Sequence, residues 1–140
     1  MSPFLIFQLL VLCQVAFADK ANDIAIQLDK TLNEPESIDS YQNLVIIPYY
    51  MESCQVSKTY TAEEMNQLMK SQYDHLQTTD GKKAVEGRLI ANAKFEGDDE
   101  KEVSYTVTYA DKEVIQYKAR EQEGGKFAFF DERVVNCNKP

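Results

Sequence analysis

The stretch EQEGGKFAFFDERVVNC, residues 121–137, gives the clearest indication of the fold. Gly124-Gly125 marks a tight turn, and residues 126–137 after it have the composition of a last strand that ends on Cys137. Before the turn, VIQYKARE (114–121) alternates apolar and polar residues, as a strand with one buried face does. The two segments predict a β-hairpin at the C-terminal end of the chain.

Two more strands are expected before this hairpin. In residues 103–109, apolar or aromatic residues alternate with serine and threonine, which is typical of a half-buried antiparallel strand. From Ala84 onward the odd-numbered residues up to Phe95 are small or apolar, so a strand is expected there as well. Turns at 97–99 and 110–112 separate the segments. The second half of the chain therefore predicts a meander of four strands.

The first part of the chain predicts a helix and a long strand. Ile24, Leu28 and Leu32 recur at four-residue spacing, which gives residues 20–33 one apolar helical face. Residues 44–56, LVIIPYYMESCQV, are rich in β-branched and aromatic residues and predict a strand, in which Pro48 should lie at an edge or a bend. A helical turn at 38–41 is expected between them.

A second strong helix follows. Thr61 and Glu64 form a capping box at its start, and an apolar stripe at three- and four-residue spacing continues to about Gln77. Thr79-Asp80-Gly81 is expected to be a turn. The order of helix, strand, helix and four strands predicts an α+β domain with a curved, mainly antiparallel sheet.

The N-terminus indicates secretion. Phe4 to Phe17 form an uncharged apolar run, which is too short to span a bilayer because that takes roughly 20 residues. Ala16-Phe17-Ala18 has small side chains at the two positions that signal peptidase requires. Residues 1–18 are therefore expected to be a cleaved signal peptide, and residues 19–140 a single extracellular domain. The alternative is a buried N-terminal helix.

Charge limits the partners. The chain has 23 acidic and 15 basic residues, a net charge of −8 at pH 7. This argues against nucleic acid or an anionic membrane surface, since both require clustered lysine and arginine. With one histidine and no neighbouring cysteine pair, no metal site is expected, and no cofactor is expected either.

The cysteines predict one disulfide. Cys13 lies in the apolar run that is expected to be removed, which leaves Cys54 and Cys137 as partners in an oxidising compartment. A metal site or a cysteine nucleophile is the alternative, and a nucleophile would need His75, the only imidazole, as its base. If the bridge forms, the ends of the first and last strands should meet, with Cα atoms within about 7 Å.

This order of elements resembles a nuclear transport factor 2-like domain. The ending EQEGGKFAFFDERV (121–134) is similar to the last hairpin of that family, and Cys54, residues 58–65 and Cys137 are arranged as in its small secreted members. Residues 33–43 are short for the second helix that family members usually have. The resemblance covers about residues 20–137 and implies a cone, in which a bent sheet wraps around helices and an apolar pocket opens at the wide end. The family includes isomerases, hydrolases and binding proteins, so the fold does not choose the function.

Two residues are weak candidates for catalysis. The resemblance implies that an Asp–His pair could act in the cone, but His75 and its neighbour Asp74 point about 100° apart on a helix, so a solvent-facing His75 is favoured. Asp131 shares the parity of Phe127 and Phe129, and on an inward face it could be a general acid or base. A bulge at Phe129-Phe130 would switch the parity and leave Asp131 and Arg133 as a surface pair, which is the favoured interpretation. Several strand tyrosines, Tyr49, Tyr50, Tyr105, Tyr109 and Tyr117, could donate hydrogen bonds to a ligand or simply pack.

The sequence thus indicates a secreted, non-enzymatic domain that binds a small apolar ligand or a protein partner, with a homodimer through its sheet as one arrangement. One alternative is an isomerase or hydrolase that uses Asp131 as a base in the cone. The other is a cystatin-like inhibitor of cysteine proteases, because Lys83-Ala84-Val85-Glu86-Gly87 is faintly similar to the Q-x-V-x-G hairpin of cystatins.

Overall fold

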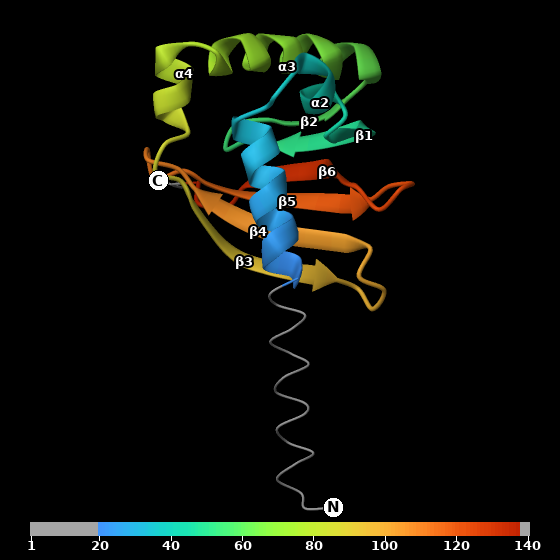
Figure 1. Cartoon of the computed structure of the whole chain (residues 1–140). Helices are drawn as coiled ribbons and strands as arrows, with labels where there is room; N and C mark the ends of the chain where they lie inside the picture. The colour runs from blue at the N-terminus through green and yellow to red at the C-terminus, as the bar shows by residue number, and fades with distance from the viewer. Residues whose placement is uncertain (1–19, 138–140) are drawn as a thin grey trace, which may run out of the picture.

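The computed structural model describes residues 20–137 (Figure 1). An N-terminal helix covers residues 20–33 of this range. The elements after it are α2 (Ile38–Gln42), β1 (Val45–Glu52), β2 (Ser57–Tyr60), α3 (Ala62–Leu76), α4 (Thr79–Ala84), β3 (Leu89–Glu96), β4 (Glu102–Thr108), β5 (Val114–Glu121) and β6 (Phe127–Val134). The expected signal peptide, residues 1–18, lies outside the described residues. Within residues 20–137, no helix combines the length and the apolar character that crossing a membrane requires.

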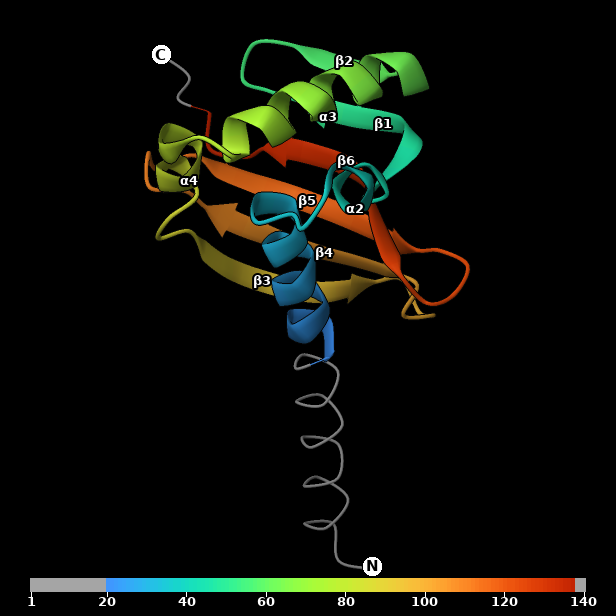
Figure 2. The same ribbon diagram turned by 45° about the horizontal axis from the view of Figure 1, so that its top comes forward.

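The six strands form one open sheet in the order β2-β1-β6-β5-β4-β3. All neighbours are antiparallel except β1 and β6, which run parallel and join the first hairpin to the meander. The helices cover one face of the curved sheet: the N-terminal helix crosses the meander strands, and α3 lies over the end formed by β1 and β2 (Figures 1 and 2). The expected α+β class and the mainly antiparallel sheet are therefore confirmed.

Local signals explain most element boundaries. The capping box is present: the Thr61 hydroxyl accepts from the backbone N–H of Glu64, and the Glu64 carboxylate accepts from the N–H of Thr61. Pro48 lies where the register of β1 against β6 shifts, between Val45 and Tyr50. This shift confirms the expected irregularity in the strand. Its physical cause is that proline has no N–H to donate to the ladder.

Three predicted boundaries were wrong. The strand expected from Ala84 onward begins only at Leu89, because Ala84 ends α4 and residues 85–88 connect it to β3. Residues 44–56 do not form one strand, because the chain turns at Ser53, whose side chain accepts from the N–H of Val56, and returns as β2. The expected turn at Thr79-Asp80-Gly81 is instead the start of α4, with the Thr78 hydroxyl capping the N–H of Gly81. At Gly81 a side chain would collide with the carbonyl of His75, so only glycine fits against the end of α3.

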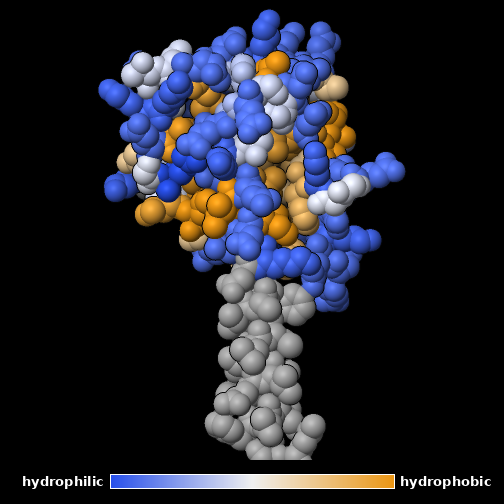
Figure 3. Space-filling view, viewed as in Figure 1, coloured by the Kyte–Doolittle hydropathy of each residue, from blue (hydrophilic) through white to orange (hydrophobic). Residues whose placement is uncertain are grey.

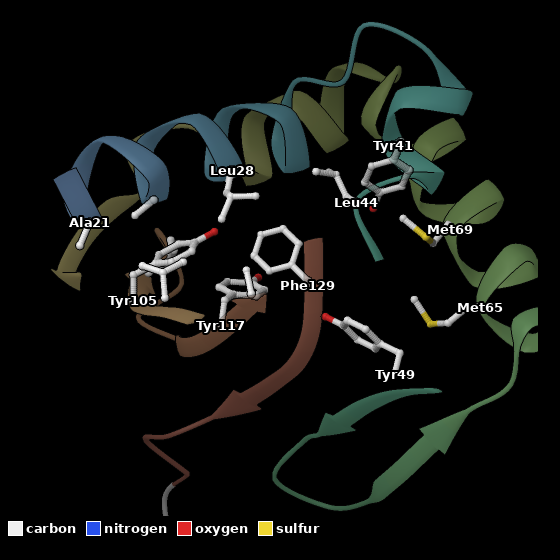
Figure 4. Packing of buried hydrophobic residues seen from close by; sticks show 14 residues of the cluster. Ala21, Leu28, Tyr41, Leu44, Tyr49, Met65, Met69, Tyr105, Tyr117 and Phe129 are labelled. Carbon is white, nitrogen blue, oxygen red and sulfur yellow. The ribbon is translucent and has the colours of Figure 1, made fainter. Parts of the chain in front are cut away.

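The interior between the helices and the sheet is filled with aromatic and aliphatic side chains (Figure 4). Tyr105, Tyr117 and Phe129 form an aromatic cluster on β4, β5 and β6, with ring centroids 5.3–6.2 Å apart. Met65 and Met69 point from α3 into the same interior and are almost fully buried. These methionines are core residues, as expected for methionine at helical spacing.

The disulfide is confirmed. Cys54 and Cys137 are bonded, and their Cα atoms are 5.3 Å apart. The bridge lies just beyond the C-terminal ends of β1 and β6, which are the only parallel pair in the described sheet. It therefore reinforces a contact between segments far apart in the sequence.

A bulge on β6 decides which side chains enter the interior. Phe129 is paired with Ala119, but the next pair in the register is Asp131 with Lys118, so Phe130 is an extra residue. Beyond the bulge, Glu132 is paired with Tyr117, which is buried in the core. The parity of the strand is switched there, and Glu132 rather than Asp131 faces inward.

Candidate functional site

The inward carboxylate is held by a tyrosine from the neighbouring strand. The Tyr49 hydroxyl on β1 donates a hydrogen bond of 2.6 Å to Oε1 of Glu132 on β6. Tyr49 is 2% exposed, and it points from β1 toward Tyr117 and Phe129 in Figure 4. Among the described residues, no lysine, arginine or histidine nitrogen forms an ion pair with Glu132. The carboxylate therefore has a hydrogen-bond donor but no counter-charge.

Burial raises the pKa of Glu132, because a charged carboxylate loses its hydration. The hydrogen bond from Tyr49 opposes this rise, while the negative charges of Asp131 and Glu113 add to it. A carboxyl group in such surroundings can hold a proton at a higher pH than usual and can donate or accept it.

The raised pKa of Glu132 predicts a pH dependence of stability. The folded state binds this proton more tightly than the unfolded state, so the contribution of Glu132 is complete below its ordinary pKa and is lost as the pH rises through the raised one. Glu132→Gln keeps a hydrogen-bond acceptor without the charge, so the wild type should lose stability relative to this variant between acid and neutral pH. Urea unfolding at several pH values measures the difference.

Glu123→Gln, a change at an exposed carboxylate in the β5–β6 turn, is the control for that series and should leave the profile unchanged. A constant difference between the wild type and Glu132→Gln at every pH would contradict the raised pKa.

Four tyrosine hydroxyls share the interior with Glu132. Tyr109 and Tyr117 hydroxyls are hydrogen-bonded to each other at 2.9 Å, and the Tyr41 hydroxyl donates to Oε1 of Gln72 at 2.9 Å. The Tyr105 hydroxyl is buried and has no partner among the described residues. Burial raises the pKa of each of these tyrosines, so their hydroxyls stay neutral donors.

A buried ion pair lies between the N-terminal helix and the start of β3. Asp29 is 3% exposed and accepts a hydrogen bond of 2.6 Å from Nε of Arg88. Asn33, one turn further along the helix, donates to the same carboxylate at 2.9 Å. Burial raises the pKa of Asp29, and the hydrogen bonds from Arg88 and Asn33 oppose that rise. This cluster joins the N-terminal helix to the start of β3, and Asn33 and Arg88 also line a hollow of about 640 Å³.

A hollow lies outside this interior, beside the N-terminal helix. We call it the helix groove; its volume is about 750 Å³. Its apolar lining residues are Ile24, Leu28, Leu44 and Phe127. Its charged lining residues are Lys20, Asp23, Asp99, Glu100, Glu121 and Lys126. In Figure 3, apolar residues flank the hydrophilic stripe of the N-terminal helix and are surrounded by hydrophilic ones.

Asp131 and His75, the catalytic candidates from the sequence, lie outside both the interior around Glu132 and the helix groove. Asp131 faces the other side of the sheet, where its two oxygens accept from Nε and Nη2 of Arg133 at 3.0 and 3.1 Å. The ring of Tyr50 lies 4.7 Å from the same guanidinium group. The hypothesis of a base in the cone required Asp131 to face inward, and the structure places this carboxylate on the outer face of the sheet. His75 is exposed on α3.

The cystatin-like segment does not have the expected setting. Lys83 and Ala84 end α4, and Gly87 follows in a connection to β3 with a positive φ of 69°. A cystatin loop joins two strands of a hairpin, whereas residues 83–87 join a helix to a strand. The structure of this segment does not support inhibition of cysteine proteases.

The sequence pattern alone did not single out Glu132. The signal that could have identified it is the run Phe129-Phe130-Asp131-Glu132, in which two aromatic residues followed by two acidic ones break the alternation. Such a break is typical of a bulge, and with the bulge placed at Phe130 the pattern assigns Glu132 to the interior. Within residues 20–137, no group of three or more potential ligands has the geometry of a metal site.

Comparisons with known proteins identify the fold. No family model matches the chain, and no curated protein matches its sequence. Among solved structures, a de novo designed protein with a curved β-sheet is similar with a TM-score of 0.58 and 14% identity, covering 84% of this chain and 99% of that one.

Two natural structures are also similar. A candidate ketosteroid isomerase from Shewanella frigidimarina has a TM-score of 0.54 at 8% identity, covering 82% of this chain and 94% of that one. An NTF-2-like protein of unknown function from Pseudomonas aeruginosa has a TM-score of 0.51 at 9% identity, covering 88% and 99%. These similarities show that the chain has a nuclear transport factor 2-like fold, as the sequence predicts. At such identities they show the fold alone.

Proposed function

We propose that the chain is a secreted, non-enzymatic domain that binds a small ligand with an apolar body in the helix groove. The observation that carries this proposal is the groove itself: its volume of about 750 Å³ lies within the roughly 300–1,000 Å³ of small-molecule sites. The Cys54–Cys137 disulfide supports secretion, because such bonds persist in oxidising compartments.

The lining of the groove suits binding better than catalysis. Leu28 and Leu44 are buried at its floor, while Ile24 and Phe127 are half-buried and accessible to a ligand. Its lining residues include no histidine and no cysteine, the side chains that most often act as base or nucleophile near neutral pH. An apolar floor with a polar rim is the common construction of a ligand site.

Filling the groove should abolish ligand binding. Gln27 is an exposed residue of the N-terminal helix that lines the groove, so Gln27→Trp places an indole ring across it without changing a core position. We expect at least a tenfold weaker affinity for an apolar probe such as octanol, measured by calorimetric titration of the protein purified from the medium of expressing cells.

Ile26→Trp is the matched control, because Ile26 is the preceding residue, is 47% exposed and does not line the groove. This variant should bind as the wild type does. Equal affinities of the two tryptophan variants for octanol would reject the groove as the site. Organic extraction of the purified protein, followed by mass spectrometry, would show whether it carries a ligand from the cell.

A second function is favoured by one observation, the hydrogen bond between Tyr49 and Glu132. A carboxyl group with a raised pKa beside neutral tyrosine hydroxyls could transfer a proton to or from a carbonyl compound. The similarity in fold to a candidate ketosteroid isomerase suggests the assay, the isomerisation of an unsaturated ketosteroid followed by its absorbance. Turnover that is lost in Glu132→Gln would support this function, and wild-type turnover no faster than that of the variant would reject it.

A further inference from the structure

We propose that the ligand of the helix groove is an organic cation, in which an ammonium group adjoins the apolar body. This inference rests on the proposed function, because it assigns the charge of a ligand that the groove is proposed to bind. It is drawn from three features of the groove: its unequal charges, the convergence of three acidic segments at one end, and an aromatic ring beside one of the carboxylates.

The charges that line the groove do not balance. Four carboxylates face two ammonium groups, so the lining has a net formal charge of −2. Nζ of Lys20 is 2.8 Å from Oε2 of Glu100, and this pairing raises the pKa of Lys20. One cation and one anion thereby compensate each other. Glu121 also lies within the electrostatic reach of Lys20, and Lys126 is the second cation of the lining, so the four carboxylates still outnumber the positive charges.

Backbone and side-chain contacts bring the acidic segments together. The N–H of Glu121, the last residue of β5, donates to the carbonyl of Lys101 at 2.8 Å, so the β3–β4 turn with Asp99 lies beside the end of β5. The ion pair between Lys20 and Glu100 attaches the N-terminal helix to the same turn. The carboxylates of the helix, the turn and β5 therefore surround one end of the groove.

An aromatic ring completes this end. Phe127 is the cross-strand partner of Glu121 in the register of β5 and β6, and both residues line the groove. Directly opposed residues of an antiparallel pair have Cβ atoms about 4.5–5.5 Å apart on the same face. A cation between them would contact the carboxylate and the face of the ring, and aromatic faces attract ammonium groups.

The same features disfavour other small ligands. An anion would bring a further negative charge to a lining of net charge −2, on a protein of net charge −8. A neutral apolar molecule would contact Ile24 and Phe127 but would leave the net charge of −2 of the lining uncompensated. An alkylammonium ion satisfies both the apolar and the acidic part of the groove.

The test compares three probes that share an eight-carbon chain: octyltrimethylammonium, octanol and octanoate. Calorimetric titration of the secreted protein, at low salt and below the concentration at which any probe aggregates, gives the three affinities. We expect octyltrimethylammonium to bind about tenfold more tightly than octanol, and octanoate to bind most weakly. The preference should shrink as salt is added.

The variant Asp23→Asn/Glu121→Gln should remove most of the preference for the cation while it leaves the affinity for octanol within about twofold. Its matched control is Glu36→Gln/Asp74→Asn, which removes two exposed carboxylates that do not line the groove and changes the net charge equally. If both double variants lost the preference for octyltrimethylammonium over octanol equally, the inference would be overturned, because the preference would then be a general effect of the net charge.

The outcomes separate the two proposals. If octanol and octyltrimethylammonium bind equally well and Gln27→Trp blocks both, the groove is a ligand site and the inference of a cationic ligand is overturned. If no probe binds in a way that Gln27→Trp blocks, the proposed function itself is rejected. Tighter binding of the cation that is lost in both Gln27→Trp and Asp23→Asn/Glu121→Gln supports both.

Discussion

Replacement of both bridged cysteines, Cys54→Ser/Cys137→Ser, is expected to lower the free energy of unfolding by about 4–5 kcal/mol. The two residues are 83 positions apart, so the bridge restricts a large part of the unfolded chain, and the chain-entropy model gives this value for a loop of that length. The bond also lies at the ends of β1 and β6, whose parallel pairing depends on contacts distant in sequence. Urea unfolding of the variant and the wild type measures the difference.

Chemical reduction provides the control for this experiment. A reductant should destabilise the wild type to about the level of the double variant and should leave the variant itself unchanged. A loss below about 1 kcal/mol would show that the denatured state is already restricted without the bond, and it would contradict the entropic account.

The second large effect is expected at the buried ion pair. Arg88→Met should lower the free energy of unfolding at pH 7 by about 3–5 kcal/mol, because it leaves the Asp29 carboxylate in a buried position without its counter-charge. The loss should be smaller in acid, where protonation of Asp29 removes the uncompensated charge. Urea unfolding of the variant at pH 7 and pH 4 measures both values.

Arg120→Met is the matched control. Nε of Arg120 is 2.9 Å from Oε1 of Glu102, but both side chains are exposed to solvent, at 47% and 35%. An ion pair of this kind contributes about 0–1 kcal/mol, so this variant should be close to the wild type. Losses of similar size in Arg88→Met and Arg120→Met would contradict the special role of the buried pair.

The regular elements of the fold could be predicted because their signals are local. The spacing of Ile24, Leu28 and Leu32 gave the N-terminal helix, and the capping residues Thr61 and Glu64 gave the start of α3. The alternation in residues 103–109 gave β4. The Cys54–Cys137 bond could be predicted from the count of cysteines and from the oxidising compartment that the N-terminal residues led us to expect.

The errors arose where a turn has no glycine or proline to mark it, or where a tertiary contact decides the local structure. The β1–β2 turn depends on hydrogen bonds within Ser53–Val56, a segment with no glycine or proline to mark it. The helix α4 contains Gly81, which indicates a turn in isolation but is required by its close approach to the end of α3. A composition rule misassigns Gly81, because the deciding atoms belong to the end of α3.

The candidate site could likewise be predicted only in part from the sequence. A bulge at Phe129-Phe130 was the favoured interpretation of the sequence, and the bulge at Phe130 leaves Asp131 on the outer face of the sheet. Its second consequence, the inward position of Glu132, depends on the pairing of β6 with β5 and on the Tyr49 hydroxyl from β1. The helix groove could not be predicted from the residue pattern, since its walls come from the N-terminal helix, from residues 40–44 and from two strand connections that are adjacent only in the folded chain.

The most direct test of the account is a titration of the isotopically labelled protein with octyltrimethylammonium, followed residue by residue in ¹H–¹⁵N NMR spectra. The account predicts that the largest shifts occur around the helix groove, at Asp23, Gln27, Glu121 and Phe127. Shifts confined to the surroundings of Glu132 and Tyr49, or spread evenly over the surface, would contradict it.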